Sequence, residues 1–139
     1  MTAREYLERP ETIRREIERK RIRTETLRRL ATRFSAEPSP IRVRSPPDPT
    51  RMQAFLAEAA DEEQEIRSLE EQRRKAFADA ALLISRLPEE KMARILEMRY
   101  LDLLPWEEIM ECVGCSSTQV FRLHQLALDI LTPAPDPGD

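Results

Sequence analysis

The sequence predicts an all-α protein, with a long antiparallel coiled-coil helical hairpin followed by a C-terminal helix-turn-helix domain. Three observations predict this fold class. The 139-residue chain has only two glycines, with 35% charged and 5% aromatic residues, a composition that disfavours a β-sandwich. Two long segments repeat apolar residues at alternating intervals of three and four, as in helices that pack along a seam. Shorter helical patterns follow Pro88.

The first long segment precedes a proline-rich stretch. Its seam comprises Tyr6, Pro10, Ile13, Ile17, Lys20, Thr24, Leu27, Ala31 and Phe34. Since Pro10 lacks the amide hydrogen that a helix interior needs, we expect the helix to start or to kink near this residue. Residues 36–50 contain five prolines and are expected to form the loop of the hairpin.

The second long segment carries a matching seam up to the break at Leu87-Pro88. Its members are Met52, Phe55, Ala59, Glu62, Ile66, Leu69, Arg73, Ala76, Ala80, Leu83 and Leu87. An isolated amphipathic helix has nothing to bury its stripe against, so we expect the two segments to pair, within one chain or across a dimer. Residues 1–35 carry five more basic than acidic side chains, and residues 52–87 carry three fewer, which suits this pairing.

The basic stretch Arg14–Arg23 has two interpretations. It is either the solvated, salt-bridged face of a coiled coil or an arm that contacts phosphates. Its acidic residues are interleaved with the basic ones, which favours the salt-bridged face.

The C-terminal third has the layout of a helix-turn-helix. Pro88 stands at the first turn of one expected helix, and Pro105 opens another that stops at Gly114. Ser116 is the expected N-cap of the last helix, with Gln119 three residues on, as in a capping box. A glycine-containing turn between two such helices is the helix-turn-helix arrangement.

The side chains that would wedge these two helices together are apolar, as the arrangement requires. They are Ile109, Val113, Cys115, Val120 and Leu123. Gly114 occupies the turn. Met110 departs from the pattern, because a small residue is preferred where the helices approach closely.

The stretch "LPEEKMARILEMRYLDLLPWEEIMECVGCSSTQVFRLHQLALDIL" resembles region 4 of sigma-70-type transcription factors. The whole chain, with its "TAREYL" start, is similar to a family of small phage and prophage proteins related to late-gene transcription regulators. This resemblance implies binding of double-stranded DNA by the last helix. The implied contact residues are Ser117, Thr118, Gln119, Phe121, Arg122 and Gln125. Such side chains read base edges or hold phosphates.

The charge of this domain departs from the family's expected chemistry. Residues 88–131 carry four more acidic than basic side chains, whereas DNA binding normally relies on Lys and Arg. A homo-oligomer could double the contacts, the basic N-terminal helix could add phosphate contacts, or the domain could bind protein instead. Two alternatives to a regulator therefore stay open: an adaptor that docks on host RNA polymerase, and a packaging protein like the small terminase subunit. In terminases the helix-turn-helix usually precedes the coil, whereas here it follows.

No catalytic, cofactor or metal site is predicted. Cys112 and Cys115 would need two more ligands to hold zinc, and His124 is the only histidine. A redox role would need a βαβ context, and no strand is predicted. We expect Cys112 to be half-buried, His124 to face the surface or a phosphate, and Trp106 to pack against the core.

Three segments are expected: the hairpin at 1–87, the helix-turn-helix domain at 88–131 and a disordered tail at 132–139. No apolar run approaches the roughly 18 residues of a membrane span. The N-terminus carries charges where a signal peptide needs its apolar core. A cytoplasmic protein is therefore expected.

Overall fold

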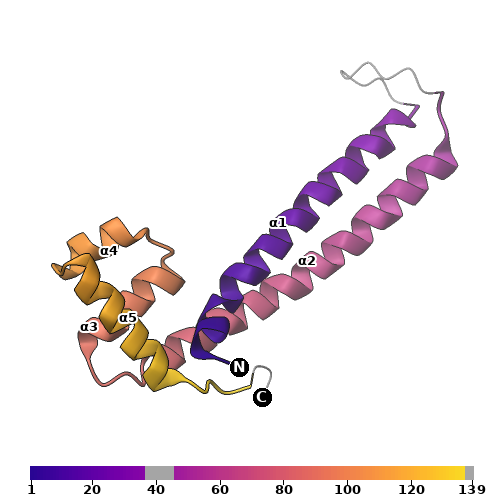
Figure 1. The fold of residues 1–139 in the computed structure, drawn as a ribbon. Helices are drawn as coiled ribbons and strands as arrows, with labels where there is room; N and C mark the ends of the chain where they lie inside the picture. Colours follow the sequence, from indigo (N-terminus) through magenta and orange to yellow (C-terminus); the bar gives the residue numbers. More distant parts are fainter. Residues whose placement is uncertain (37–45, 137–139) are drawn as a thin grey trace. The chain divides into compact units, whose positions relative to one another are not determined.

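The computed structural model describes residues 1–36 and 46–136. The regular elements in these ranges are all helical, which confirms the predicted all-α class (Figure 1). They are α1 (Ala3–Arg33), α2 (Pro49–Ile84), α3 (Glu90–Leu96), a π-helical turn η1 (Glu97–Leu101), α4 (Trp106–Val113) and α5 (Ser117–Leu131). Residues 37–45 of the expected loop lie outside the described part, and Pro49 and Thr50 already belong to α2.

Helix α1 does not start at Pro10. It begins at Ala3, and Pro10 lies inside it with a buried side chain. A proline in a helix interior leaves the carbonyl four residues earlier, here that of Tyr6, without its helical hydrogen bond. Of the two expected alternatives, a helix start near Pro10 is wrong, because α1 includes two turns before it. These first turns are available for packing.

The residues group into two compact units. Unit 1 consists of Met1–Thr12 and Gln72–Asp139, and unit 2 consists of Ile13–Glu71. These units differ from the expected division into 1–87 and 88–131. Both ends of the expected hairpin segment belong to the same unit as the C-terminal helices.

In unit 2, the two long helices run antiparallel and side by side (Figure 1). Every seam residue expected in this unit is buried or half-buried, and Ile17, Leu27 and Ile66 are buried. Near the loop, the rings of Phe34 and Phe55 stack with centroids 6.0 Å apart. The unit is thus held by the apolar stripe that the spacing predicts.

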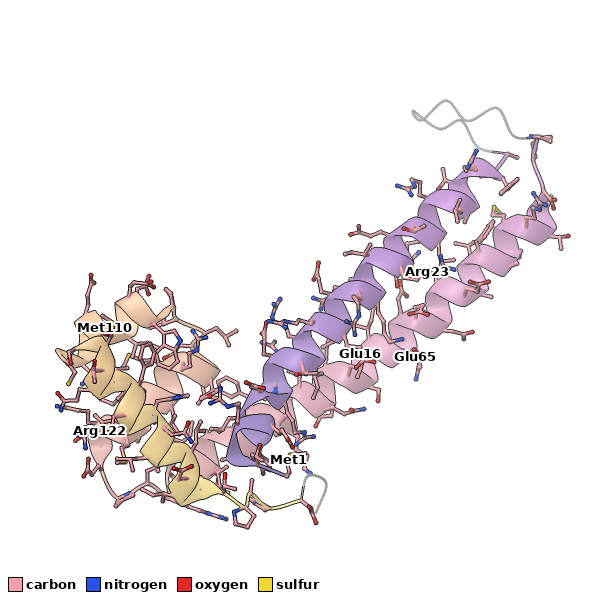
Figure 2. All side chains as sticks on the ribbon, in the orientation of Figure 1. Met1, Glu16, Arg23, Glu65, Met110 and Arg122 are labelled. Atoms are coloured by element: carbon pink, nitrogen blue, oxygen red, sulfur yellow. The ribbon has the colours of Figure 1, made fainter. Side chains whose placement is uncertain are left out.

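Ion pairs flank this seam and join α1 to α2 (Figure 2). The pairs are Lys20 with Glu62 and Glu65, Arg21 with Glu70, Arg23 with Glu58, and Arg28 with Glu63. Most of these side chains are exposed, and exposed pairs contribute about 0–1 kcal/mol each to stability. They support the interpretation of the basic stretch as a salt-bridged face.

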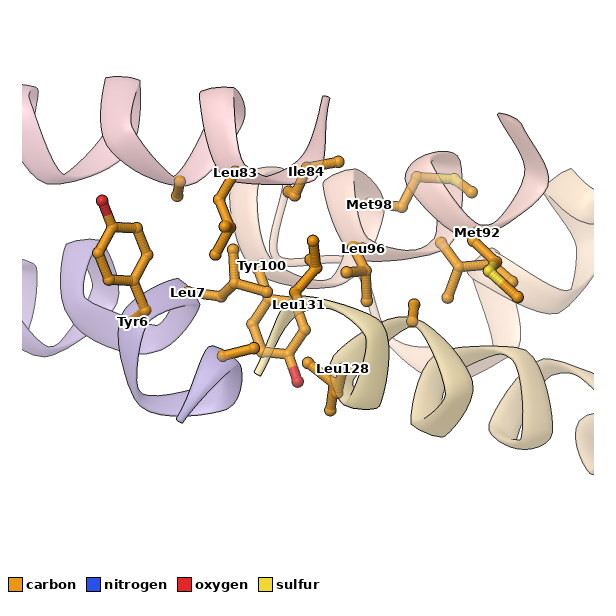
Figure 3. Close-up of a cluster of buried hydrophobic side chains, with 14 of the residues drawn as sticks. Tyr6, Leu7, Leu83, Ile84, Met92, Leu96, Met98, Tyr100, Leu128 and Leu131 are labelled. Atoms are coloured by element: carbon orange, nitrogen blue, oxygen red, sulfur yellow. The ribbon is translucent and has the colours of Figure 1, made fainter. Parts of the chain in front are cut away.

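In unit 1, one hydrophobic core joins the N-terminus to the C-terminal helices (Figure 3). Its buried members from the long helices are Ala3, Tyr6, Leu7, Ala80, Leu83 and Ile84. Those from the shorter elements are Met92, Ile95, Leu96, Met98, Tyr100, Ile109, Val120, Leu123, Ala127, Leu128 and Leu131, and Ala134 joins them from the segment after α5. The short helices therefore bury their apolar faces partly against the first turns of α1 and the end of α2.

The first residues of the expected disordered tail are held in unit 1. The backbone N–H of Ala3 donates to the Thr132 hydroxyl at 3.0 Å, and the N–H of Ala134 donates to the carbonyl of Met1 at 3.1 Å. Ala134 is also buried. The prediction of disorder is wrong for these residues, because they pair with the N-terminus. Residues 137–139 lie outside the described part.

The first of the short helices is interrupted. Helix α3 starts at Glu90, just beyond Pro88, and passes into η1 at Glu97. There the N–H of Asp102 donates to the carbonyl of Glu97 at 2.9 Å, five residues back. The wider turn changes which side chains face inward, and it places Tyr100 in the core.

Candidate nucleic-acid interface

The bend between α4 and α5 has the predicted local geometry. Gly114 ends α4 in the left-handed conformation, with φ 68°, and its N–H donates to the carbonyl of Met110 at 2.9 Å. Ser116 caps α5, because its hydroxyl accepts a hydrogen bond from the N–H of Gln119 at 3.3 Å. Both the glycine C-cap and the serine N-cap are therefore confirmed.

Replacing Gly114 with alanine should destabilise the protein by about 1–2 kcal/mol. A Cβ built at this position meets no atom within 4 Å, so the cost comes from the positive φ alone. Gly114→Asn should cost less, because asparagine tolerates this conformation better. Thermal unfolding of the two variants beside the wild type checks both values. An alanine variant as stable as the wild type would contradict the assigned backbone.

The side chains that were expected to wedge α4 against α5 are packed as predicted. Ile109 and Val120 are fully buried and Leu123 is nearly so, while Val113 and Cys115 pack against the core from its edge. Met110 stands where a small residue was preferred, and its side chain is half-buried at the edge of the core. An unbranched methionine adapts its shape to such a gap.

The six residues implied as DNA contacts all lie exposed on the first three turns of α5. They are Ser117, Thr118, Gln119, Phe121, Arg122 and Gln125. In the described part of the chain no ion pair holds Arg122, which is labelled in Figure 2. The side-chain amide of Gln125 donates to a carboxylate oxygen of Asp129 at 3.0 Å. The helix therefore presents a polar face with one cationic side chain.

An aromatic cluster connects this face to the core. The ring of Trp106, at the start of α4, meets Phe121 edge to face at 5.0 Å. The guanidinium of Arg99 lies over the Trp106 ring, 4.5 Å from its centroid. Trp106 thus packs as expected, and it supports one side of the half-exposed Phe121 ring.

His124 does not face the surface or a phosphate, as the sequence had suggested. Its side chain is buried, and its Nε2 lies 2.8 Å from the Tyr100 hydroxyl. Burial, together with the smaller effect of the charges of Arg4 and Arg99, lowers the pKa of His124 to about 4. Burial also raises the pKa of Tyr100. Both side chains are therefore neutral near pH 7, and the Tyr100 hydroxyl donates to Nε2 in the tautomer that is protonated at Nδ1.

The two cysteines contribute no recognisable site. Cys112 is exposed, which corrects the expected half-burial, and Cys115 is half-buried with its thiol 3.7 Å from the Val113 carbonyl oxygen. Within residues 1–36 and 46–136, no group of three or more His, Cys, Asp or Glu side chains is placed to hold a metal ion. Across the same ranges, every helix is too short or too polar to traverse a bilayer.

The sequence reasoning missed two features of this region. One is the pairing of His124 with Tyr100, which depends on the π-turn and has no local signal. The other is a basic pair on α3, Lys91 and Arg94, which lines a depression beside the end of α4. The second could have been found from its three-residue spacing, which places both side chains on one helical face.

Comparison of the chain with protein-family models, with curated proteins and with solved structures gives no match.

Proposed function

We propose that this protein is a sequence-specific DNA-binding transcriptional regulator of phage type. In this proposal α4 and α5 form a helix-turn-helix like that of sigma-70 region 4, and the paired α1 and α2 form a coiled coil through which the chain oligomerises. The protein is cytoplasmic and has no catalytic role. The observation that carries the proposal is the exposed face of α5 from Ser117 to Gln125, on a helix with a capped start and a fixed bend before it.

The proposed contacts follow from the chemistry of that face. With the N-terminal turns of α5 in the major groove, Gln119 and Arg122 would read base edges, since amide and guanidinium groups form paired hydrogen bonds with adenine and guanine. Ser117 and Thr118 would hold phosphates beside the helix N-terminus. The half-exposed Phe121 would contact a thymine methyl group.

Changing Gln119 and Arg122 to alanine together should abolish sequence-specific binding. The target is found by selection from a random duplex library with the wild-type protein, and a mobility shift then compares the variants. Loss of two paired base contacts should weaken specific binding by about 2–6 kcal/mol, which removes the shift. Gln53→Ala with Arg67→Ala, two exposed residues of α2, is the matched control. Unchanged binding by the α5 variant would refute its role as the recognition helix.

A second candidate is an adaptor that docks on RNA polymerase. It is favoured by two apolar side chains one helical turn apart on α5: Leu126 is 40% exposed and Ile130 is 50% exposed. Exposed apolar side chains on a domain with an acidic surplus suit a protein partner. Capture of purified bacterial RNA polymerase, without binding to duplex DNA at low salt, would favour the adaptor.

A further inference from the structure

The C-terminal helices have few cationic side chains with which to hold DNA. Residues 88–131 contain four, namely Lys91, Arg94, Arg99 and Arg122. Arg99 is already engaged, because its guanidinium covers the Trp106 ring and donates to the Leu104 carbonyl at 3.3 Å. Lys91, Arg94 and Arg122 are therefore the side chains available in this segment to neutralise phosphates.

Lys91 and Arg94 form a pair on α3. They lie three residues apart, on one face of the helix, and both are exposed. Together with Glu90 and Val113 they line an open depression of about 210 Å³. In the part of the chain that the structure describes, neither cation takes part in an ion pair. An anion entering this depression would meet two cations that no ion pair engages, with the carboxylate of Glu90 beside them.

The depression lies next to the bend that leads into α5. Val113 is the last residue of α4, and Ser116 is the N-cap of α5. Three virtual bonds of about 3.8 Å separate their Cα atoms, so the distance is at most about 11 Å. The major groove is about 12 Å wide. With the start of α5 in the groove, the depression is therefore within reach of the phosphates at the groove edge.

We propose that Lys91 and Arg94 form a phosphate clamp that holds the DNA backbone beside the recognition helix. This inference rests on the proposed DNA-binding function. It adds the part of the binding that does not depend on the base sequence, namely contacts to the phosphates. The clamp supplies charge that α5, with its single Arg122, lacks. The carboxylate of Glu90, which lines the same depression, offsets one of the two positive charges.

The test measures binding to a fluorescein-labelled random-sequence 30-bp duplex by anisotropy, over a series of salt concentrations. Lys91→Gln with Arg94→Gln should weaken binding about tenfold or more. It should also reduce the slope of log K against log salt by about 1.8, which corresponds to two phosphate contacts. Glu90→Gln should tighten binding. Lys75→Gln with Arg86→Gln, two exposed cations of unit 1 outside the depression, should leave the slope unchanged.

The outcomes separate this clamp from the proposed function. If the wild type binds neither the random duplex nor selected DNA at low salt, both proposals fail. If the wild type binds but the Lys91 and Arg94 variant keeps its slope, the clamp alone is refuted. If the Lys91 and Arg94 variant keeps the salt slope but prefers other DNA sequences, these two side chains contact bases. That result would also refute the clamp. Because both side chains are exposed, an unchanged unfolding midpoint checks that the variant is folded.

Discussion

Truncating Leu7 to alanine is expected to destabilise the C-terminal helices by about 3–5 kcal/mol. Leu7 is fully buried in α1, in the same core as Leu96 and Leu131 (Figure 3). The truncation removes apolar surface from that core and leaves a cavity that the neighbours fill only in part. Since small domains are stable by roughly 5–15 kcal/mol, this loss should lower the unfolding midpoint strongly.

The measurement is urea unfolding followed by the fluorescence of Trp106, the only tryptophan of the chain. Trp106 starts α4, so its signal reports on the C-terminal helices and not on α1 itself. Leu82→Ala is the matched control, because Leu82 belongs to the same unit but is 63% exposed. It should change stability by less than about 0.5 kcal/mol. If Leu7→Ala leaves the urea midpoint of the Trp106 transition unchanged, the N-terminus is not part of this core.

Acidification is expected to destabilise the wild type more than a variant without His124. The folded-state pKa of about 4 lies below the usual value of 6.5, so the unfolded chain binds more protons between these values. The stabilisation is therefore complete above about pH 6.5 and is lost as the pH falls towards 4. Between pH 6.5 and 5 the loss should be on the order of 2 kcal/mol.

His124→Gln is the variant for this comparison, because an amide can still accept a hydrogen bond from Tyr100 but does not titrate. The free energy of unfolding of His124→Gln should fall less steeply between pH 6.5 and 5. The carboxyl groups of the protein contribute equally to the pH dependence of both proteins, so the difference in slope reports on His124. Burial is the main cause of the lowered pKa of His124, and the charges of Arg4 and Arg99 add to it. The Tyr100 hydroxyl lies 2.8 Å from Nε2. Equal slopes for the two proteins would mean that His124 is solvated, as the sequence alone had suggested.

Much of the candidate interface was predictable because its determinants are local. The glycine at the bend and the serine cap act within four residues, and both are confirmed. The exposed contact face also follows from helical periodicity once the inward side chains are assigned. The predicted exposure of His124 was wrong because the burial of this side chain depends on residues far away in the sequence. On one turn of the helix it neighbours both buried Leu123 and exposed Gln125, and only its partners decide between burial and exposure.

The sequence by itself determined the all-helical class, the apolar seams of the two long helices and the capped bend between α4 and α5. These features depend on residue spacing, backbone preference and hydrogen bonds between near neighbours. Only the tertiary structure decided that the first turns of α1 share a core with the C-terminal helices, and that the tail is held by Ala3 and Met1. Those contacts join residues far apart in the sequence, as in the Ala3–Thr132 hydrogen bond with its separation of 129. Their free energy comes from burying apolar surface that the folded chain brings together, and no local pattern records it.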